Sequence, residues 1–287
     1  MLKIQDLNLK IGQKQILRNM TVSFESGDVY GIVGPNGVGK TTLFKSILGI
    51  TRYQGKINID GKPINDAQVG KLIEYPNFYQ ALTVKQNLQL SAKYIGADEA
   101  KVIQALKEVN LIHAVDMKFR DLSLGMKQRL GIARALMGND QILLLDEPQN
   151  GLDPLGIKAV RELLNTPAIR KDKVTLLASH NLNEISRIVD KIVFVNHGEI
   201  IGQIDNQTDS IYYVYSHTGK ITVPVNQQWQ ISRIKSSNYI LTTLNEDQLT
   251  DLIQQFDWQF IGDITSLENL FDFVITGEVD GNVNADE

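Results

Sequence analysis

The chain of 287 residues contains no cysteine, which excludes disulfide bonds, thiolate zinc sites and thiol nucleophiles. It also lacks any apolar run near the ~18 residues that a membrane-spanning helix needs. The N-terminal residues 1–6 have neither the basic start nor the apolar core of a signal peptide. We therefore expect a cytosolic protein that reaches a membrane only through a partner.

An excess of basic residues is also missing, because the formal net charge is −4 and the isoelectric point is near 5.7. Proteins that bind nucleic acid usually carry a basic face, so nucleic acid is not the expected main partner. The composition is otherwise that of an ordinary globular protein, with 43% hydrophobic and 22% charged residues.

Hydrophobic patterning predicts an α/β fold. Apolar and polar residues roughly alternate over residues 2–11 and 20–24, as in strands of a half-exposed sheet. The run 29–33 is apolar throughout, as a buried strand should be, and the mostly apolar runs 141–145 and 174–178 also read as buried strands. Helical patterns lie between these runs, so we expect a mostly parallel core sheet covered by helices, with an antiparallel β subdomain.

A block of helical spacing interrupts the strand pattern between about residues 82 and 140, with Asp98 as a helix cap. We interpret it as a helical subdomain inserted in the core. Near residue 195, His197 and Gly198 predict the turn of a hairpin that closes the core. This first domain is expected to span residues 1–205.

The composition changes from about Asn206 onward, and residues 206–277 are interpreted as a small α+β appendage. Its expected elements are strand-like segments near 211–225 and 231–244, a helix over 246–256, a strand, and a helix over 266–273. Residues 278–287 are acidic and poor in apolar side chains, which predicts disorder. Packing against the core is the default role for the appendage, with dimer support or regulation as alternatives.

A phosphate-binding loop follows the first buried strand. Its sequence is Gly34-Pro35-Asn36-Gly37-Val38-Gly39-Lys40-Thr41, with Thr42 opening a helix pattern. Glycines allow the backbone to curl and to direct several N–H groups at a phosphate, at a helix N-terminus that favours anions. Lys40 is expected to reach the β- and γ-phosphates of ATP, and the Thr41 hydroxyl to bind Mg²⁺. An ordinary glycine-rich turn has no need of Lys and Thr at this spacing.

Two adjacent carboxylates, Asp146 and Glu147, end the second buried strand. A solvated strand end explains one acid, but two neighbouring acids at a buried edge favour a cation or a proton. Because successive strand residues point in opposite directions, we expect Asp146 to face Mg²⁺ and Glu147 to polarise the attacking water.

A helix capped by Ser123 carries the string Leu122-Ser123-Leu124-Gly125-Met126-Lys127-Gln128-Arg129-Leu130. Alone, this string is an ordinary amphipathic helix start. Between the phosphate loop and the acidic strand, it resembles the LSGGQ signature of ABC ATPases. The segment Asn150 to Asp153 resembles the D-loop of that family, and His180 stands at its switch-histidine position. The resemblance covers roughly residues 1–205.

The resemblance implies a mechanical enzyme that hydrolyses ATP. Two cassettes, identical or different, would pack head to tail, with each ATP between the phosphate loop of one and the signature helix of the other. Ser123 and Gly125 would then contact the γ-phosphate bound by the partner, with Asp153 nearby. Closing and opening of this dimer would drive separate membrane permease subunits at the inner face of the cell membrane. The cargo and the direction of transport stay open.

The chain departs from the common family pattern at several positions. Leu124 replaces a Gly, Met126 a Gln, Gln149 a frequent Thr, and Ile11 the aromatic that stacks on adenine. Glu74 occupies the place of the Q-loop glutamine, which contacts Mg²⁺ and the membrane subunit. This Glu and the signature string resemble the lantibiotic-immunity and bacitracin-resistance branch. The plain alternative is an exposed loop carboxylate at position 74.

Two other functions are compatible with an ABC cassette. The first is a factor that acts on ribosomes or DNA, but such proteins usually carry two cassettes or a long coiled-coil insertion. The second is a cassette that binds ATP without hydrolysing it. The complete set of Lys40, Asp146, Glu147 and His180 argues against the second alternative.

Overall fold

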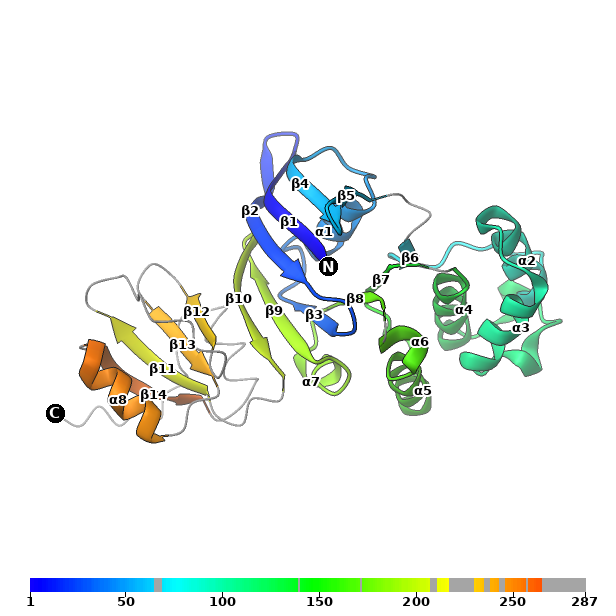
Figure 1. The fold of residues 1–287 in the computed structure, drawn as a ribbon. Coiled ribbons are helices and arrows are strands. Elements are labelled where there is room, and N and C mark those ends of the chain that lie inside the picture. The colour runs from blue at the N-terminus through cyan, green and yellow to red at the C-terminus, as the bar shows by residue number, and fades with distance from the viewer. Residues whose placement is uncertain are drawn as a thin grey trace.

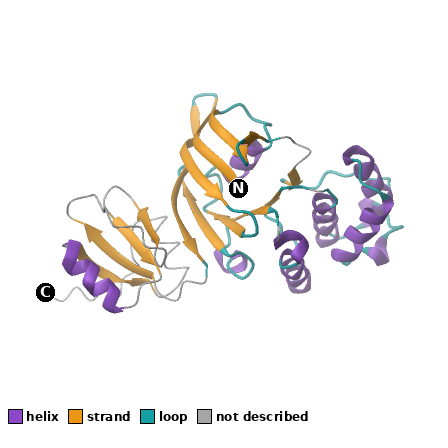
Figure 2. Cartoon of the chain, in the orientation of Figure 1, coloured by secondary structure: helices purple, strands orange, loops and turns teal. Residues whose placement is uncertain are grey.

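The computed structural model describes residues 1–64, 69–138, 140–170, 172–206, 211–216, 230–234, 238–242, 246–256 and 258–264. Within these residues the strands form three sheets, and Figure 1 shows two groups of helices beside the central one. Figure 2 separates the same elements by type, with α2 to α6 at one side of the central strands and a smaller sheet with its helix at the other.

The first sheet is antiparallel, with strand order β2-β1-β4-β5. Its strands are β1 (Leu2–Ile11), β2 (Lys14–Phe24), β4 (Gln54–Ile59) and β5 (Lys62–Pro63). The register of β1 on β2 shifts between Ile4 and Leu7, where Asp6 has a φ of 50°. This irregularity explains why the apolar residues of β1 alternate only roughly in the sequence.

The central sheet has six strands in the order β10-β9-β3-β8-β7-β6. They are β3 (Val29–Val33), β6 (Val69–Leu72), β7 (Ile142–Asp146), β8 (Val174–Ser179), β9 (Lys191–Asn196) and β10 (Glu199–Asp205). The pairs β3/β8, β3/β9, β6/β7 and β7/β8 are parallel, whereas β9 and β10 form an antiparallel hairpin. His197 and Gly198 turn that hairpin with positive φ values of 49° and 78°, as tight hairpin turns require. The expected α/β class is confirmed.

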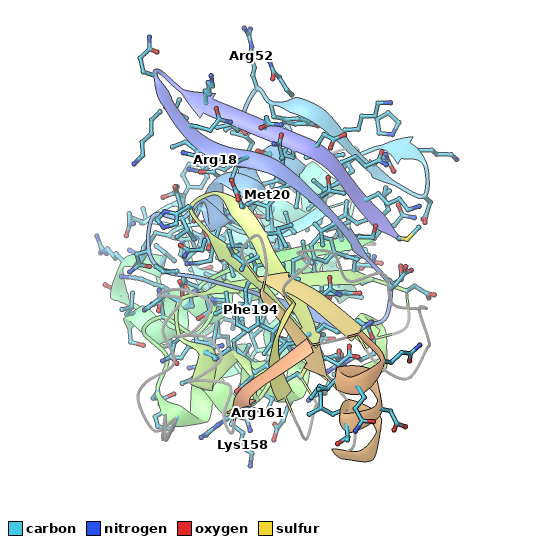
Figure 3. All side chains as sticks on the ribbon, turned by 90° about the vertical axis from the view of Figure 1, so that its left-hand side faces the viewer. Arg18, Met20, Arg52, Lys158, Arg161 and Phe194 are labelled. Atoms are coloured by element: carbon cyan, nitrogen blue, oxygen red, sulfur yellow. The ribbon has the colours of Figure 1, made fainter. Side chains whose placement is uncertain are left out.

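The central sheet separates two hydrophobic cores, because alternate residues of its strands point to opposite faces. Leu143 and Leu145 of β7 belong to the core under the helices, and Ile142 and Leu144 belong to the core under the antiparallel sheet. Figure 3 shows Met20 of the second core above Phe194 of the first. In the same view Arg18 and Arg52 lie at the antiparallel end, and Lys158 and Arg161 at the opposite end.

Helices and short 3₁₀ turns connect the core strands. They are α1 (Lys40–Ile47), α2 (Val84–Ile95), α3 (Glu99–Glu108), η2 (Ile112–Ala114), η3 (Phe119–Asp121), α4 (Leu124–Leu136), α5 (Pro154–Leu164), α6 (Pro167–Arg170) and α7 (Leu182–Ile185). The expected Asp98 cap is confirmed, since Asp98 Oδ1 accepts a bond from the Lys101 amide. α4 packs against β6 as well as against α2 and α3, so it joins the helical group to the sheet.

A third sheet follows, with order β12-β13-β11-β14. Its elements are β11 (Ile211–Ser216), β12 (Gln230–Ile234), β13 (Asn238–Thr242), α8 (Glu246–Phe256) and β14 (Trp258–Ile264). The helix expected over 246–256 is confirmed. The segment 231–244 is not one strand but the antiparallel pair β12 and β13. The helix expected over 266–273 and the tail 278–287 lie outside the described residues.

The described part of the chain holds no helix with the length and apolarity that a bilayer span requires.

Candidate functional site

The site forms where parallel strands of the central sheet end. Gly34 follows β3, Glu147 follows β7 and His180 follows β8, while Glu74 lies two residues beyond β6. The carboxyl ends of parallel strands meet at one edge of a sheet, which is where ligands bind in open α/β folds. Residues far apart in the sequence are thus brought together by strand pairing alone.

The phosphate loop joins β3 to α1 by a path that only glycine allows at two points. A Cβ on Gly34 would collide with the carbonyl oxygen of Val195, so the loop lies tight against β9. Gly39 has a φ of 111°, which side-chain-bearing residues rarely adopt. α1 begins directly after it at Lys40, and its N-terminal amides face the loop. This is the geometry of an anion-binding helix start.

Lys40 is buried although it is charged, with a residue exposure of 6%. Its Nζ donates to the carbonyl oxygens of Gly34 at 2.6 Å and Pro35 at 3.1 Å. Burial lowers the pKa of Lys40, and the negative charges of Glu147 and Asp146 oppose this shift. The ammonium group is therefore held inside the loop, where an added phosphate would be a strong partner for it.

Thr41 and Asp146 form the next contact, between the first turn of α1 and the end of β7. The Thr41 hydroxyl donates to Asp146 Oδ2 at 2.6 Å. Burial raises the pKa of Asp146, the Thr41 hydrogen bond opposes the shift, and the Glu147 charge adds to it.

A hydroxyl beside a carboxylate supplies the hard oxygen ligands that Mg²⁺ prefers. In the described residues no group of three or more His, Cys, Asp or Glu side chains forms a metal cage. Magnesium sites in phosphate-transferring enzymes use one or two carboxylates plus substrate phosphates. Thr41 and Asp146 therefore fit a magnesium site that the phosphates of a bound nucleotide would complete.

Glu147 lies beyond the end of β7 and has a left-handed φ of 48°. Its direction therefore comes from a turn, not from the strand alternation on which the sequence argument relied. Its amide donates to the Ala178 carbonyl at 2.9 Å, and its Oε1 lies 2.8 Å from Nδ1 of His180. The backbone of Glu147 is thus held by β8, and its carboxylate is held by His180, which follows β8.

Glu74 also has a left-handed φ, of 58°, but its side chain is 62% exposed. Its Oε1 forms a 2.5 Å ion pair with Nζ of Lys45, in the last turn of α1. Lys45 did not stand out in the sequence, because nothing local links it to a residue 29 positions away.

A cleft of about 650 Å³ brings most of these residues together. The predicted site residues on its wall are Asn36, Gly37, Gly39, Lys40, Thr41, Thr42, Glu74, Asp146 and Glu147. Ile16, Tyr75, Leu124, Gln128, Asn150 and Gly151 complete the wall. Gly34, Pro35, Val38 and His180 are not on the wall, but Gly34 and Pro35 contact Lys40 and His180 contacts Glu147.

Ser123, Gly125 and Asp153 are not part of the cleft wall in this chain. Ser123 caps α4 by accepting a bond from the Met126 amide at 3.2 Å, and Asp153 caps α5 by accepting from the Gly156 amide at 2.8 Å. Both side chains thus have local structural roles. Gln128 lies four residues after Leu124 and shares its helix face, a spacing that could have placed it at the site.

Comparison with known proteins agrees with this geometry. The family described as "ABC transporter" matches residues 17–150. A lantibiotic transport ATP-binding protein of Streptococcus pyogenes is 36% identical over 206 residues, which is 70% of this chain and 89% of that protein. A bacitracin transport ATP-binding protein of Enterococcus faecalis is 32% identical over 272 residues, covering 92% of this chain and 86% of the relative.

Among solved structures, a dimeric bacterial ABC transporter cassette superposes with a TM-score of 0.65 and 25% identity, covering 72% of this chain and 99% of its own. The alignment with the Enterococcus protein spans too much of the chain to end at residue 205, so the similarity includes part of the C-terminal region.

Proposed function

The chain belongs to the ABC transporter ATP-binding proteins, and from this premise we propose that it is the ATP-hydrolysing subunit of an antimicrobial-peptide exporter. It dimerises on ATP, as a homodimer or with a second cassette, and drives separate membrane permease subunits. Its place is the cytoplasm, peripheral on the inner face of the cell membrane. Residues 1–205 form the ATPase, with helices of a subdomain between 82 and 140, and 206–277 form the appendage.

The observation that carries this proposal is the meeting of two side-chain pairs at the phosphate loop. Thr41 with Asp146 provides oxygen ligands, and Glu147 with His180 provides a carboxylate fixed toward the cleft. A phosphate loop alone indicates nucleotide binding. The addition of a held carboxylate indicates hydrolysis, because an attacking water must be oriented beside the γ-phosphate.

Lys40 and the residues of these two pairs have distinct tasks in hydrolysis. Lys40 exchanges its bonds to the Gly34 and Pro35 carbonyls for the β- and γ-phosphate oxygens. Glu147 accepts a hydrogen bond from the attacking water and takes its proton, and His180 keeps the carboxylate directed at the cleft. Thr41 and Asp146, with Glu74 on the wall of the same cleft, would hold Mg²⁺, which would supply positive charge at the phosphoryl oxygens.

The position of the signature residues supports a dimer. Ser123 and Gly125 begin the 13-residue helix α4 but do not line this chain's own cleft. Ser123 and Gly125 are therefore available to the ATP of a second subunit, whose phosphates a helix N-terminus would attract. The similar cassette of known structure is itself a dimer.

A groove lined by large apolar side chains and by Lys71, Arg134 and Asp140 supports a permease partner. Tyr79, Leu90, Tyr94 and Ile95 are all large and exposed, and Tyr94 has an exposure of 87%. They border a groove of about 750 Å³ between α2 and β6, a few residues from Glu74. Exposed aromatic and aliphatic clusters of this kind mark protein contacts. The peptide cargo is proposed because relatives are named for bacitracin and lantibiotic transport.

The two alternatives are less well supported. A ribosome or DNA factor would need a basic surface to bind phosphate backbones, whereas this chain has a net charge of −4. A cassette without hydrolysis has no use for a carboxylate held at both its backbone and its side chain.

The proposal is tested with the purified chain and with the Lys40→Ala variant. We expect Mg²⁺-dependent phosphate release from ATP by the parent and its loss in the variant, together with weakened binding of a fluorescent ATP analogue. In cells, removal of the gene should increase sensitivity to bacitracin or a lantibiotic, and the Lys40→Ala gene should not restore resistance. Restoration by that variant would contradict the export function.

A further inference from the structure

Gln128 is a buried polar residue in the site for which the hydrolytic scheme above has no task. It lies in the second turn of α4, with an exposure of 5%, and its Nε2 donates to the backbone carbonyl of Glu147 at 3.1 Å. Buried amide groups are retained where their hydrogen bonds matter, because an unpaired one destabilises the fold.

The peptide that Gln128 holds has a conformation that needs support. Glu147 has a φ of 48°, which residues other than glycine seldom adopt. Its carbonyl accepts from Gln128 and from the amide of Asn150, and its own amide donates to Ala178. Such backbone conformations persist only where the surroundings fix them, and here α4 supplies one of the fixing bonds.

α4 also carries the signature residues, which contact a second subunit in the function proposed above. Ser123 caps the helix, and Leu124 lies so close to Gly151 that a Cβ there would collide with it. Gln128 follows one helical turn after Leu124, and a helical turn is a rigid connection of ~5–6 Å. A displacement of the helix start is therefore transmitted to the bond on Glu147.

We propose that Gln128 is a positioning residue that fixes the backbone of Glu147, and that it links the signature helix to the hydrolytic carboxylate of the same chain. This rests on the proposed function, in which the start of α4 contacts ATP bound by the partner subunit. ATP held by one subunit would then affect the position of the base that acts on the other ATP.

The test replaces Gln128 by Met, which has similar volume and no strong hydrogen-bond donor. We expect the kcat for ATP hydrolysis to fall by roughly 10- to 10²-fold, as a small misplacement of a reacting group does. The KM for ATP and the binding of a fluorescent ATP analogue should stay within about twofold, because no phosphate contact is lost. Because this variant hydrolyses ATP more slowly, its ATP-bound dimer should also persist longer than that of the parent, as followed by size-exclusion chromatography over time.

A merely structural role gives a different result. If Gln128→Met disturbed the signature helix as a whole, the dimer would fail to form with ATP, and the inference would be wrong. The matched control is Arg129→Leu, on the same helix, since Arg129 bonds the carbonyls of Val109 and Asn110 and not Glu147. It should lower the melting temperature while kcat stays within about twofold.

Glu147→Gln, measured in parallel, separates this inference from the proposed function. If Glu147→Gln keeps its hydrolysis, the base assignment itself fails. If Glu147→Gln is inactive and Gln128→Met matches the parent in kcat, only the role of Gln128 is refuted. In the double variant we expect no loss beyond that of Glu147→Gln, because both changes act through one carboxylate.

Discussion

Two glutamates of this chain follow neighbouring parallel strands at the same register. Leu72 of β6 pairs with Leu145 of β7, so Glu74 and Glu147 each stand two residues beyond a paired position. Both have left-handed backbones, with φ values of 58° and 48°, and both line the cleft. Their surroundings nevertheless differ: the Glu147 side chain is 23% exposed and the Glu74 side chain is 62% exposed.

The contacts explain the difference. Glu147 is held by Ala178, Asn150 and Gln128 through its backbone and by His180 through its carboxylate. The Glu74 carboxylate forms an ion pair with Lys45 that is open to water. A carboxylate that orients water must be fixed, whereas one that follows the closing of a site must be able to exchange partners. The same backbone geometry thus carries a carboxylate fixed by several contacts at one strand end and an exposed carboxylate at the next.

The largest expected effect is that of Glu147→Gln. The amide keeps the size of the side chain but cannot take a proton, and general bases contribute typically ~10²–10⁴-fold to rate. We expect kcat to fall by that range while ATP still binds and the ATP-bound dimer accumulates. Phosphate-release assays and size-exclusion chromatography with ATP measure both effects. Turnover within a few-fold of the parent would show that Glu147 is not the base.

His180→Ala should have the next largest effect. It removes the 2.8 Å partner of the Glu147 carboxylate but leaves the carboxylate itself. Since a misplacement near 1 Å can cost ~10²-fold in rate, we expect kcat to fall by about 10- to 10²-fold. Added to Glu147→Gln, the change should lower kcat no further. A large additional loss would mean that His180 acts on the phosphate independently of Glu147.

The sequence was sufficient to predict the buried strands, the family and the site residues that belong to a motif or end a strand. The buried strands β3, β7 and β8 were visible as apolar runs, and the fold class and the family are confirmed. The assignments of Lys40, Thr41 and Asp146 followed from spacing, and the structure places these residues in one cleft. Their roles in ATP binding and hydrolysis remain predictions.

The sequence did not reveal what depends on contacts between distant segments. β6 has four residues including Gly70 and Lys71, too few and too polar to resemble a buried strand, and it is defined by its pairing with β7. The ion pair of Lys45 with Glu74 and the bond of Gln128 to Glu147 join residues with no local relation. Alternation along β7 also suggested a direction for Glu147 that its turn conformation replaces.

Gly and Ala variants at positions 74 and 147 test whether both glutamates have a left-handed backbone in solution. A left-handed residue with a Cβ is disfavoured by roughly 1–2 kcal/mol, so Glu74→Gly should be more stable than Glu74→Ala by ~1 kcal/mol. In a protein of this size this corresponds to roughly 2–4 °C in melting temperature. The same pair of variants at position 147 should differ by a similar amount. An Ala variant as stable as the Gly variant would show that the φ at that position is not retained in solution.

The smallest expected effect concerns the pair of Lys45 and Glu74, and it tests whether Glu74 is free to exchange partners. Exposed ion pairs contribute typically ~0.2–1 kcal/mol and weaken with salt. A double-mutant cycle of Lys45→Met and Glu74→Gln should give a coupling energy in that range at low salt and less at 1 M salt. The ATPase activity of the isolated subunit should stay within about an order of magnitude in each variant, since neither residue holds the attacking water.

What should change is the response to Mg²⁺. A carboxylate beside the triphosphate repels it unless a cation lies between them, so Glu74→Gln should shift the Mg²⁺ concentration that gives half-maximal hydrolysis. Lys45→Met should shift it in the opposite direction, because Glu74 loses its competing partner. The matched control is Lys85→Met, since the ion pair of Lys85 with Glu99 is similarly exposed but joins α2 to α3. If both site variants gave the parent's Mg²⁺ curve and the parent's resistance in cells, Glu74 would be an exposed loop carboxylate, and the contrast with Glu147 would concern structure alone.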